Sequence, residues 1–335
     1  MGVIKIQSDI QALQLHWGIL TQLADGELHS GQDMAKELSV SRSAIWKALR
    51  KLELYGLNVE HRRGVGYRLA AGRLELLSKS RIYDHLRGHQ EALNCAFKIF
   101  KEVGSTNQYL LDQRLSGPAI CLAEYQSAGR GRRGRQWHSP FGSNLYLSVA
   151  WPFRGGASEL AGLSLAVGVS VNDALTSVGV CGGGLKWPND LLFGGKKLAG
   201  ILIDLRGEAD GVVWAVIGIG INVLMTDDVD SIIDQPWTSC VEQAGIEISR
   251  NQLAGEVIKA LFKDLPRFES DGFAAFQSRW QELDVLQGQP VWVEQDGKSV
   301  RASALGVDGA GGLLVEIEGQ RRVINSGEVS VRVAN

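Results

Sequence analysis

The chain has 335 residues, of which 44% are hydrophobic and 21% are charged, and its formal net charge is −2. This composition is typical of a soluble globular protein with a buried core, and the length favours two or three domains. A net charge this close to zero argues against a protein coated with nucleic acid, although it leaves room for a local basic patch.

The four cysteines lie far apart in the sequence and form no CxxC pair; they are Cys95, Cys121, Cys181 and Cys240. This spacing supports neither a disulfide framework nor a zinc site, so free thiols in a reducing cytosol are expected. Residues 1–11 contain no apolar signal core, and no stretch comes close to the ~20 apolar residues of a membrane-spanning helix. We therefore expect a cytoplasmic protein with no membrane partner.

Three short helices followed by a hairpin are predicted for residues 1–72. An apolar stripe that includes Leu13 marks the first helix, and Ser30 and Ser41 are suited to cap the second and third. The sequence VEHRRGVGYRL at residues 59–69 predicts two short strands around a basic turn that contains glycine.

The exposed side of the third helix and the hairpin carry cationic and hydrogen-bonding groups. These candidate DNA contacts are Arg42, Ser43, Trp46, Lys47, Arg50, Arg62 and Arg63. Between residues 42 and 68 there are seven Arg and Lys side chains and two Glu, which gives a local charge of +5. A helix of this kind suits the major groove and a basic hairpin suits the phosphate backbone, so DNA binding is predicted. The alternative is a helical bundle whose charged outer face is merely solvated.

A second domain, of mixed α/β type, is predicted for residues 80–282, after a helical pattern that begins at residues 74–77. Three apolar runs have the composition of strands: residues 144–151, 198–205 and 212–219. Residues 160–178 have helical spacing. Beyond Trp280, short β-like runs separated by glycines predict a third domain over residues 283–335.

The densest cluster of charge is GRGRRGR at residues 129–135. It matches the pattern GxGxxG, but a dinucleotide site needs a helix to begin at these glycines, and QWHSP at residues 136–140 follows instead. Arginines on a glycine-rich loop favour a mobile clamp for phosphates or a carboxylate. The alternative is a surface loop that binds nucleic acid or nothing.

Four further segments bear polar groups that could serve a site. GSTNQYLL at residues 104–111 has hydroxyls and an amide at a helix start, where capping is their ordinary role. KWPND at residues 186–190 places a lysine and an aspartate around a proline turn, and GGKKLAGILID at residues 194–204 places two lysines at the start of a buried strand. GIGIN at residues 218–222 ends another strand with glycines that let a ligand approach the backbone.

Taken in this order, EYQSAGRGRRGR, KWPND, KLAGIL and GIN resemble the sequence signature of bacterial biotin protein ligases. LHSG at residues 28–31 and SRSAIWK at residues 41–47 resemble the winged helix-turn-helix of biotin operon repressors. The resemblance covers nearly the whole chain. It implies an α+β multidomain protein: a winged helix-turn-helix, a central ligase domain of the class II synthetase-like biotin/lipoate type, and a C-terminal SH3-like β-barrel.

The resemblance implies a bifunctional protein. As an enzyme, it would form biotinyl-5′-AMP from biotin and ATP, with Mg²⁺, and transfer biotin to a lysine of the biotin carboxyl carrier protein of acetyl-CoA carboxylase. As a repressor of biotin biosynthesis genes, it would bind operator DNA as a homodimer, and bound ligand would promote formation of that homodimer.

The same resemblance implies which residues carry these roles. The biotin-binding residues it implies are Ser105, Thr106, Asn107, Gln126, Arg130, Gly131, Arg132 and Lys197. The ATP-binding residues it implies are Arg130, Arg132, Lys186, Asn222, Trp237 and Arg332. Lys197 and Arg132 are the expected catalytic residues, and Asp190 and Asn222 are the candidates for contact with Mg²⁺.

Three residues depart from the sequence pattern of the family that the chain resembles: Gln136, His138 and Gly104. The first two put the ordering of the arginine loop in doubt, but not the class of reaction. Three alternatives stay open: an adenylate-forming lipoate ligase, a regulator that senses biotin without turnover, and an active ligase whose DNA-binding domain has lost its operator. A pocket of hydroxyls and amides suits the ureido ring of biotin better than a dithiolane.

Overall fold

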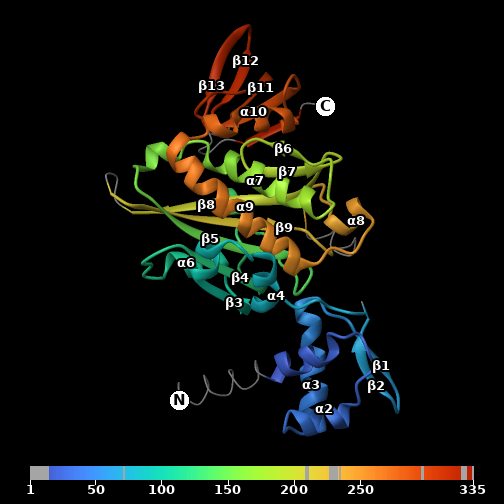
Figure 1. Cartoon of the computed structure of the whole chain (residues 1–335). Coiled ribbons are helices and arrows are strands. Elements are labelled where there is room, and N and C mark those ends of the chain that lie inside the picture. The colour runs from blue at the N-terminus through green and yellow to red at the C-terminus, as the bar shows by residue number, and fades with distance from the viewer. Residues whose placement is uncertain are drawn as a thin grey trace, which may run out of the picture. The chain divides into compact units, whose positions relative to one another are not determined.

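A computed structural model describes residues 15–70, 72–207, 211–225, 233, 235–295, 298–325 and 330–333. The predicted stripe residue Leu13 lies outside these ranges. The chain divides into two compact units: residues 1–77 with 140–142, and residues 78–139 with 143–335 (Figure 1).

The first unit contains the predicted helices and hairpin. Helical residues 15–23 are followed by α2 (Gly31–Glu37), α3 (Arg42–Leu52) and the 3₁₀ turn η1 (Glu53–Tyr55). Strands β1 (Val59–Arg62) and β2 (Gly66–Leu69) pair antiparallel. Both predicted caps are confirmed, because Ser30 Oγ accepts from Gln32 N and Ser41 Oγ accepts from Ala44 N.

The core of this unit is aliphatic in the middle and aromatic at one end. Its buried members include Ile19, Leu20, Leu23, Met34, Ile45, Leu49 and Leu52. Trp17 stacks on Phe141 with ring centroids 5.1 Å apart, and Tyr55 meets Phe141 edge-on at 6.2 Å. The short segment Pro140–Gly142 thus belongs to the core of the first unit, although it comes from the middle of the sequence.

The second unit is built on a seven-stranded sheet with the order β3-β4-β5-β9-β8-β7-β6. Its strands are β3 (Ala96–Val103), β4 (Ala119–Gln126), β5 (Leu145–Phe153), β6 (Gly184–Lys186), β7 (Asp190–Phe193), β8 (Lys196–Arg206) and β9 (Val213–Ile221). Only β3 and β4 pair in parallel; the other neighbours are antiparallel. The three predicted strands are confirmed as β5, β8 and β9.

Helices cover both faces of this sheet (Figure 1). The helices of this unit are α4 (Lys79–His85), α5 (Gln90–Asn94), α6 (Thr106–Leu111), α7 (Leu163–Ser177), α8 (Cys240–Ala244), α9 (Arg250–Asp271) and α10 (Ala274–Leu283). Trp151 of β5 meets Phe262 of α9 on one face, and Leu110 of α6 packs against the neighbouring residue Ala150 on the other. The helix predicted at residues 74–77 is wrong, because regular structure begins only at Lys79.

The apolar helix predicted at residues 160–178 is confirmed as α7, with eleven of its fifteen residues buried. By length and composition alone, the segment Ala157–Ser177 could cross a membrane. However, 67% of its most apolar window is buried inside the fold, as in the core helix of a globular domain.

The β-rich C-terminus forms a five-stranded antiparallel sheet with the order β13-β12-β11-β10-β14. Its strands are β10 (Pro290–Gln295), β11 (Lys298–Val307), β12 (Leu313–Ile317), β13 (Gln320–Ile324) and β14 (Ser330–Val333). A link to the large sheet is made by Trp187, whose fully buried indole donates from Nε1 to Gly311 O at 3.1 Å.

Candidate active site

The face of the large sheet beneath α6 carries glycines and other small residues, together with Leu202 and Tyr146. Residues that pair across β4, β5, β9 and β8 form two adjacent rows: Cys121, Ser148, Gly218 and Leu202, then Ala123, Tyr146, Gly220 and Gly200. A Cβ on Gly218 would lie 2.3 Å from Asn107 Oδ1, and one on Gly220 would lie 2.5 Å from the Trp137 ring. These glycines are therefore required for the close approach of α6 and the arginine loop to the strands.

A neutral network of hydroxyls and amides lies over these rows. Gln126 Oε1 accepts from Thr106 N at 2.9 Å and from Thr106 Oγ1 at 3.1 Å. Ser148 Oγ lies 2.7 Å from Thr106 Oγ1 and 2.6 Å from Asn107 Oδ1. Asn107 Nδ2 donates to Asp204 Oδ2 at 2.9 Å. The structure thus brings together three of the predicted biotin-binding residues.

Ser105, the fourth of this group, caps α6 and is 7% exposed. Thr106, Asn107 and Ser148 are at most 4% exposed. Two hydroxyl protons, on Thr106 and Ser148, serve three acceptor contacts, so small rotations can offer a ligand either a donor or an acceptor. The network can therefore bind a neutral group that has both N–H and C=O functions.

The arginine loop forms a compact turn beside this network. Arg130 and Gln136 make an isolated antiparallel bridge, and Gly131 N donates to Arg135 O at 2.7 Å. Arg130 forms an ion pair with Asp204. Arg132 Nη1 donates to Asn189 Oδ1 at 3.3 Å, and burial lowers the pKa of Arg132 while Asp190 opposes that shift. The loop thus directs its two expected anion-binding arginines toward different neighbours.

Trp137, which follows the arginine loop, packs over Gly200 and Gly220 in the rows of paired residues described above, here called the glycine rows. Its ring lies over Lys197, with Nζ 5.4 Å from the centroid, and among the described residues its buried Nε1 has no hydrogen-bond partner. Ser139 Oγ accepts from Gln126 Nε2 at 3.2 Å and donates to Trp137 O at 2.9 Å. The indole therefore forms a wall between the neutral network and the charged part of the site.

Lys197 is held through both its side chain and its backbone. Its Nζ lies 2.7 Å from Asp190 Oδ1, an ion pair whose angles do not make an aligned hydrogen bond. Lys197 N donates to Pro236 O, and Lys197 O accepts from Thr238 N, each at 2.9 Å. The parallel bridge to Trp237 thus ties a predicted ATP-binding residue directly to Lys197.

Positive charge gathers around Asp190. Burial lowers the pKa of Lys186, Asp190 opposes this shift, and Lys197, Arg332 and Arg135 lower the pKa further by repulsion. Arg332 is 70% exposed at its side chain and lies 3.9 Å from Glu294. This side of the site therefore has more cations than carboxylates, which suits a polyanion.

Asn222 and Trp237, two of the predicted ATP-binding residues, are both buried. Asn222 is 4% exposed, and its Nδ2 donates to Thr238 O at 3.1 Å and lies 3.5 Å from Lys197 O. Trp237 is 7% exposed. Both residues hold the backbone around Lys197, and their contact with ATP stays a prediction.

For Mg²⁺, the described residues contain no group of three or more His, Cys, Asp or Glu that could hold an ion. Asp190 provides one carboxylate beside the cationic cluster. Mg²⁺ commonly takes one or two carboxylates and completes its shell with substrate phosphates and water, so this donor set fits an ion that arrives with ATP.

In the first unit, α3 and the hairpin expose the predicted DNA contacts. Trp46 is 50% exposed, and the Arg50 guanidinium lies 5.2 Å from its ring centroid. The other predicted contacts are also exposed: Arg42, Ser43, Lys47, Arg62 and Arg63. Arg68 instead forms an ion pair with Glu60 at 2.8 Å. The basic face therefore includes both the third helix and the hairpin.

Comparison with known proteins gives one consistent family. Residues 99–222 match the biotin/lipoate A/B protein ligase family, residues 18–68 match an HTH domain, and residues 287–332 match the biotin protein ligase C-terminal domain. The bifunctional ligase/repressor BirA of Escherichia coli is 39% identical over 94% of this chain and 97% of its own length. The chain belongs to the biotin protein ligase family.

Two further relatives bear on the parts of this biotin protein ligase. The biotin–[acetyl-CoA-carboxylase] ligase of Paracoccus denitrificans is 32% identical over 64% of this chain and 91% of its own length. The structure of the Aquifex aeolicus biotin protein ligase in complex with biotin and ATP matches with a TM-score of 0.63 and 29% identity, over 71% of this chain and 99% of that one. The predicted fold class, with its helix-turn-helix, ligase and C-terminal parts, is confirmed.

Sequence reasoning missed four residues of this ligase site: Ser139, Ser148, Asp204 and the wall residue Trp137. It also missed a fully buried ion pair, in which Arg250 Nη1 donates to Glu124 Oε2 at 2.8 Å. Ser148 had a usable signal, because it is a polar residue at a buried position of an otherwise apolar strand. Asp204 and Trp137 had none, because their partners lie far away in the sequence.

Proposed function

We propose that this ligase binds biotin over the glycine rows beneath α6, binds ATP among the cations around Asp190, and joins the two as biotinyl-5′-AMP. It then transfers biotin to a lysine of the biotin carboxyl carrier protein of acetyl-CoA carboxylase. The observation that supports this most strongly is that a neutral hydroxyl and amide network lies next to a cluster of lysines and arginines. Asp204 bonds both Asn107 and Arg130, and Lys197 lies against the Trp137 ring and Asp190.

The neutral network supports biotin as the acid. A ureido ring has one strong acceptor oxygen and two N–H donors, and Ser105, Thr106, Asn107 and Gln126 can satisfy all three without net charge. A dithiolane makes no such hydrogen bonds, so it would gain nothing from the donors and acceptors that this network can offer a ligand. The alternative of a lipoate ligase is therefore disfavoured.

The cationic cluster supports the chemistry of adenylation. A carboxylate oxygen of biotin attacks the α-phosphorus of ATP, a P–O bond forms, and pyrophosphate leaves with the electron pair of the broken bond. Because both reactants are anions, cations must offset their repulsion as they meet. We assign this role to Lys197 and Arg132, with Arg130 and Gly131 on the loop that closes over biotin.

The nucleotide is bound, in this proposal, by Arg130, Arg132, Lys186, Asn222, Trp237 and Arg332. Mg²⁺ bound to the phosphates would neutralise part of their charge, with Asp190 as the nearest carboxylate and Asn222 as a second candidate. In the second step, a neutral lysine amine of the carrier protein attacks the acyl carbon, an amide forms, and AMP leaves.

The test is incubation of the full chain with ATP, Mg²⁺, biotin and a carrier-protein domain, followed by mass spectrometry of the acceptor. We expect one added biotin on one lysine, and the same reaction with lipoate should be far slower. A chain that binds biotin but never modifies the acceptor or exchanges pyrophosphate into ATP would be a sensor without turnover, and the proposal would be wrong.

We further propose that this ligase acts in the cytoplasm and that its first unit binds operator DNA as a homodimer formed when ligand is bound. Arg42, Ser43, Trp46, Lys47 and Arg50 would contact the major groove, and Arg62 and Arg63 the phosphates. Gel-shift titrations of operator DNA should show tighter binding when biotin and ATP are present. Binding that ignores the ligand would contradict the linkage.

A further inference from the structure

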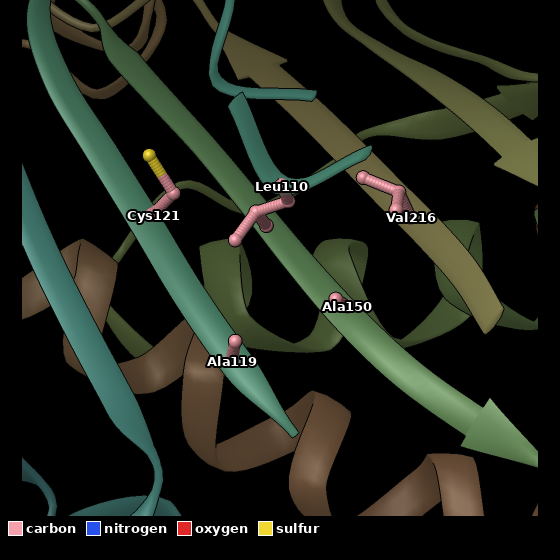
Figure 2. Packing of buried hydrophobic residues seen from close by; sticks show 5 residues of the cluster. All are labelled: Leu110, Ala119, Cys121, Ala150 and Val216. Carbon is pink, nitrogen blue, oxygen red and sulfur yellow. The ribbon is translucent and has the colours of Figure 1, made fainter. Parts of the chain in front are cut away.

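The row pattern beneath α6 does not end at the proposed biotin site. One step further along the strands, Ala119, Ala150 and Val216 pair across β4, β5 and β9, and Leu110 of α6 packs on them. Figure 2 shows Leu110 above these strands, together with Cys121. The same face of the sheet therefore carries a second set of small side chains under the C-terminal half of α6.

A recess lies at the edge of this cluster. Its open volume is about 180 Å³, and its apolar lining includes Leu110, Leu115, Trp214 and Val216. A well-packed core leaves few voids larger than a water molecule, so a space of this size can hold a ligand. Pockets for drug-sized ligands measure roughly 300–1,000 Å³, so an occupant of this recess must be small.

Two arginines, Arg114 and Arg206, stand at the mouth of the recess. Arg206 Nη1 donates to Leu111 O and, at 2.8 Å, to Gln113 O, which fixes its guanidinium at the rim. Arg114 is exposed and makes no hydrogen bond or ion pair with any described residue. The neighbouring carboxylate Asp112 accepts from Gln108 Nε2 at 2.8 Å. The mouth therefore carries two cations above an apolar floor.

We propose that this recess is a second ligand site, which binds a short aliphatic carboxylate. The alkyl chain would lie on Leu110, Leu115 and Val216, and the carboxylate would meet the guanidiniums of Arg114 and Arg206. Charge-assisted contacts with Arg favour a carboxylate over a neutral head group of the same size. Burial of the chain favours a longer acid over acetate.

The recess is separate from the proposed biotin site. Between the two lies a layer formed by Asn107 and Asp204, which hydrogen-bond each other, and by the backbone of Val216, whose oxygen is 3.5 Å from Asn107 Nδ2. A ligand in the recess thus contacts the C-terminal end of α6 and the part of β9 around Val216. Biotin and the carboxylate should therefore be able to bind at the same time.

The experiment is a ligand-observed NMR titration of the full chain with hexanoate, in the presence and absence of saturating biotin. We expect a dissociation constant in the millimolar range, as suits so few heavy atoms, and no displacement by biotin. Hexanol and acetate should each bind at least several-fold more weakly. Displacement of hexanoate by biotin would place it in the ligase site and overturn the proposal.

Two variants locate the ligand. Arg114→Gln should weaken hexanoate binding several-fold, and Leu115→Trp, which fills the recess, should abolish it. Both variants should keep the wild-type rate of biotin transfer, which also shows that they fold. Arg87→Gln, which changes an exposed arginine outside the recess, is the matched control. Unchanged hexanoate binding in both Arg114→Gln and Leu115→Trp would overturn the proposal, whatever the outcome of the ligase assay.

Discussion

The two halves of the ligase site are built in opposite ways. In the neutral half, Thr106, Asn107, Gln126 and Ser148 bond one another, so the site is organised by contacts within the chain. In the cationic half, Lys186 and its neighbouring cations repel one another around Asp190. The neutral half is preorganised for a group of fixed shape. In the cationic half, the repulsion between the cations is relieved when an anion binds.

This difference predicts different consequences of mutation. Changes in the neutral half should mainly weaken the binding of biotin, because its groups act on a part of the substrate whose charge does not change during the reaction. Changes in the cationic half should mainly lower the rate, because charge redistributes there in the transition state.

The largest effect is expected for Lys197→Ala. Loss of the cation between carboxylate and phosphate should lower the rate of adenylation by about 10²–10³-fold, measured by pyrophosphate exchange. Lys196→Ala is the matched control, because Lys196 is the adjacent lysine on the same strand and is exposed. If both variants lost activity equally, general charge and not the position of Lys197 would govern the rate.

Gly220→Ala should be the most damaging change in the neutral half. The new Cβ would come 2.5 Å from the Trp137 ring, so the indole wall must move. Overpacking of about 1–3 kcal/mol corresponds to a rise of about 5–150-fold in the KM for biotin. Gly309→Ala provides the control, since a Cβ there meets nothing within 4 Å. A wild-type KM in Gly220→Ala would mean that Trp137 does not shape the biotin pocket.

Ser148→Ala tests the hub of the neutral network with a smaller change. Removal of the hydroxyl leaves Thr106 and Asn107 without their shared partner, and the KM for biotin should rise about 10-fold at unchanged kcat. Ser177→Ala removes a hydroxyl whose one hydrogen bond among the described residues is to Ala174 O in its own helix, so it should leave KM unchanged. A fall in kcat in Ser148→Ala would show that Ser148 contributes to the rate of the reaction, as the residues of the cationic half are expected to do.

The sequence was sufficient for those parts of the fold and site that are coded locally. The caps Ser30 and Ser41, the hydroxyls at the start of α6, and the apolar runs of β5, β8 and β9 are each contained in a few consecutive residues. Their physical causes, namely capping and alternation, act over the same short range. For this reason they could be predicted without coordinates.

The contacts that complete the site depend on register and on distance in the chain. Ser148 meets Gly218 only because β5 and β9 pair in one particular register, and Asp204 meets Arg130 across 74 positions. The helix expected at residues 74–77 did not form, since an apolar run without a cap is a weak signal for a helix start. Long-range pairing therefore limits what composition and spacing can predict.

The smallest expected effect is a change in pH dependence that separates the two halves. Burial and the neighbouring cations lower the pKa of Lys186, so this lysine loses its proton at a lower pH than an ordinary lysine does. As pH rises, the KM for ATP should therefore increase by a few-fold before other lysines titrate, while the KM for biotin stays level. Lys186→Arg should remove the rise, because a guanidinium keeps its charge, and Lys196→Arg should leave the profile as it is. A parallel rise in both KM values would show that the two halves titrate as one site, and the contrast between them would fail.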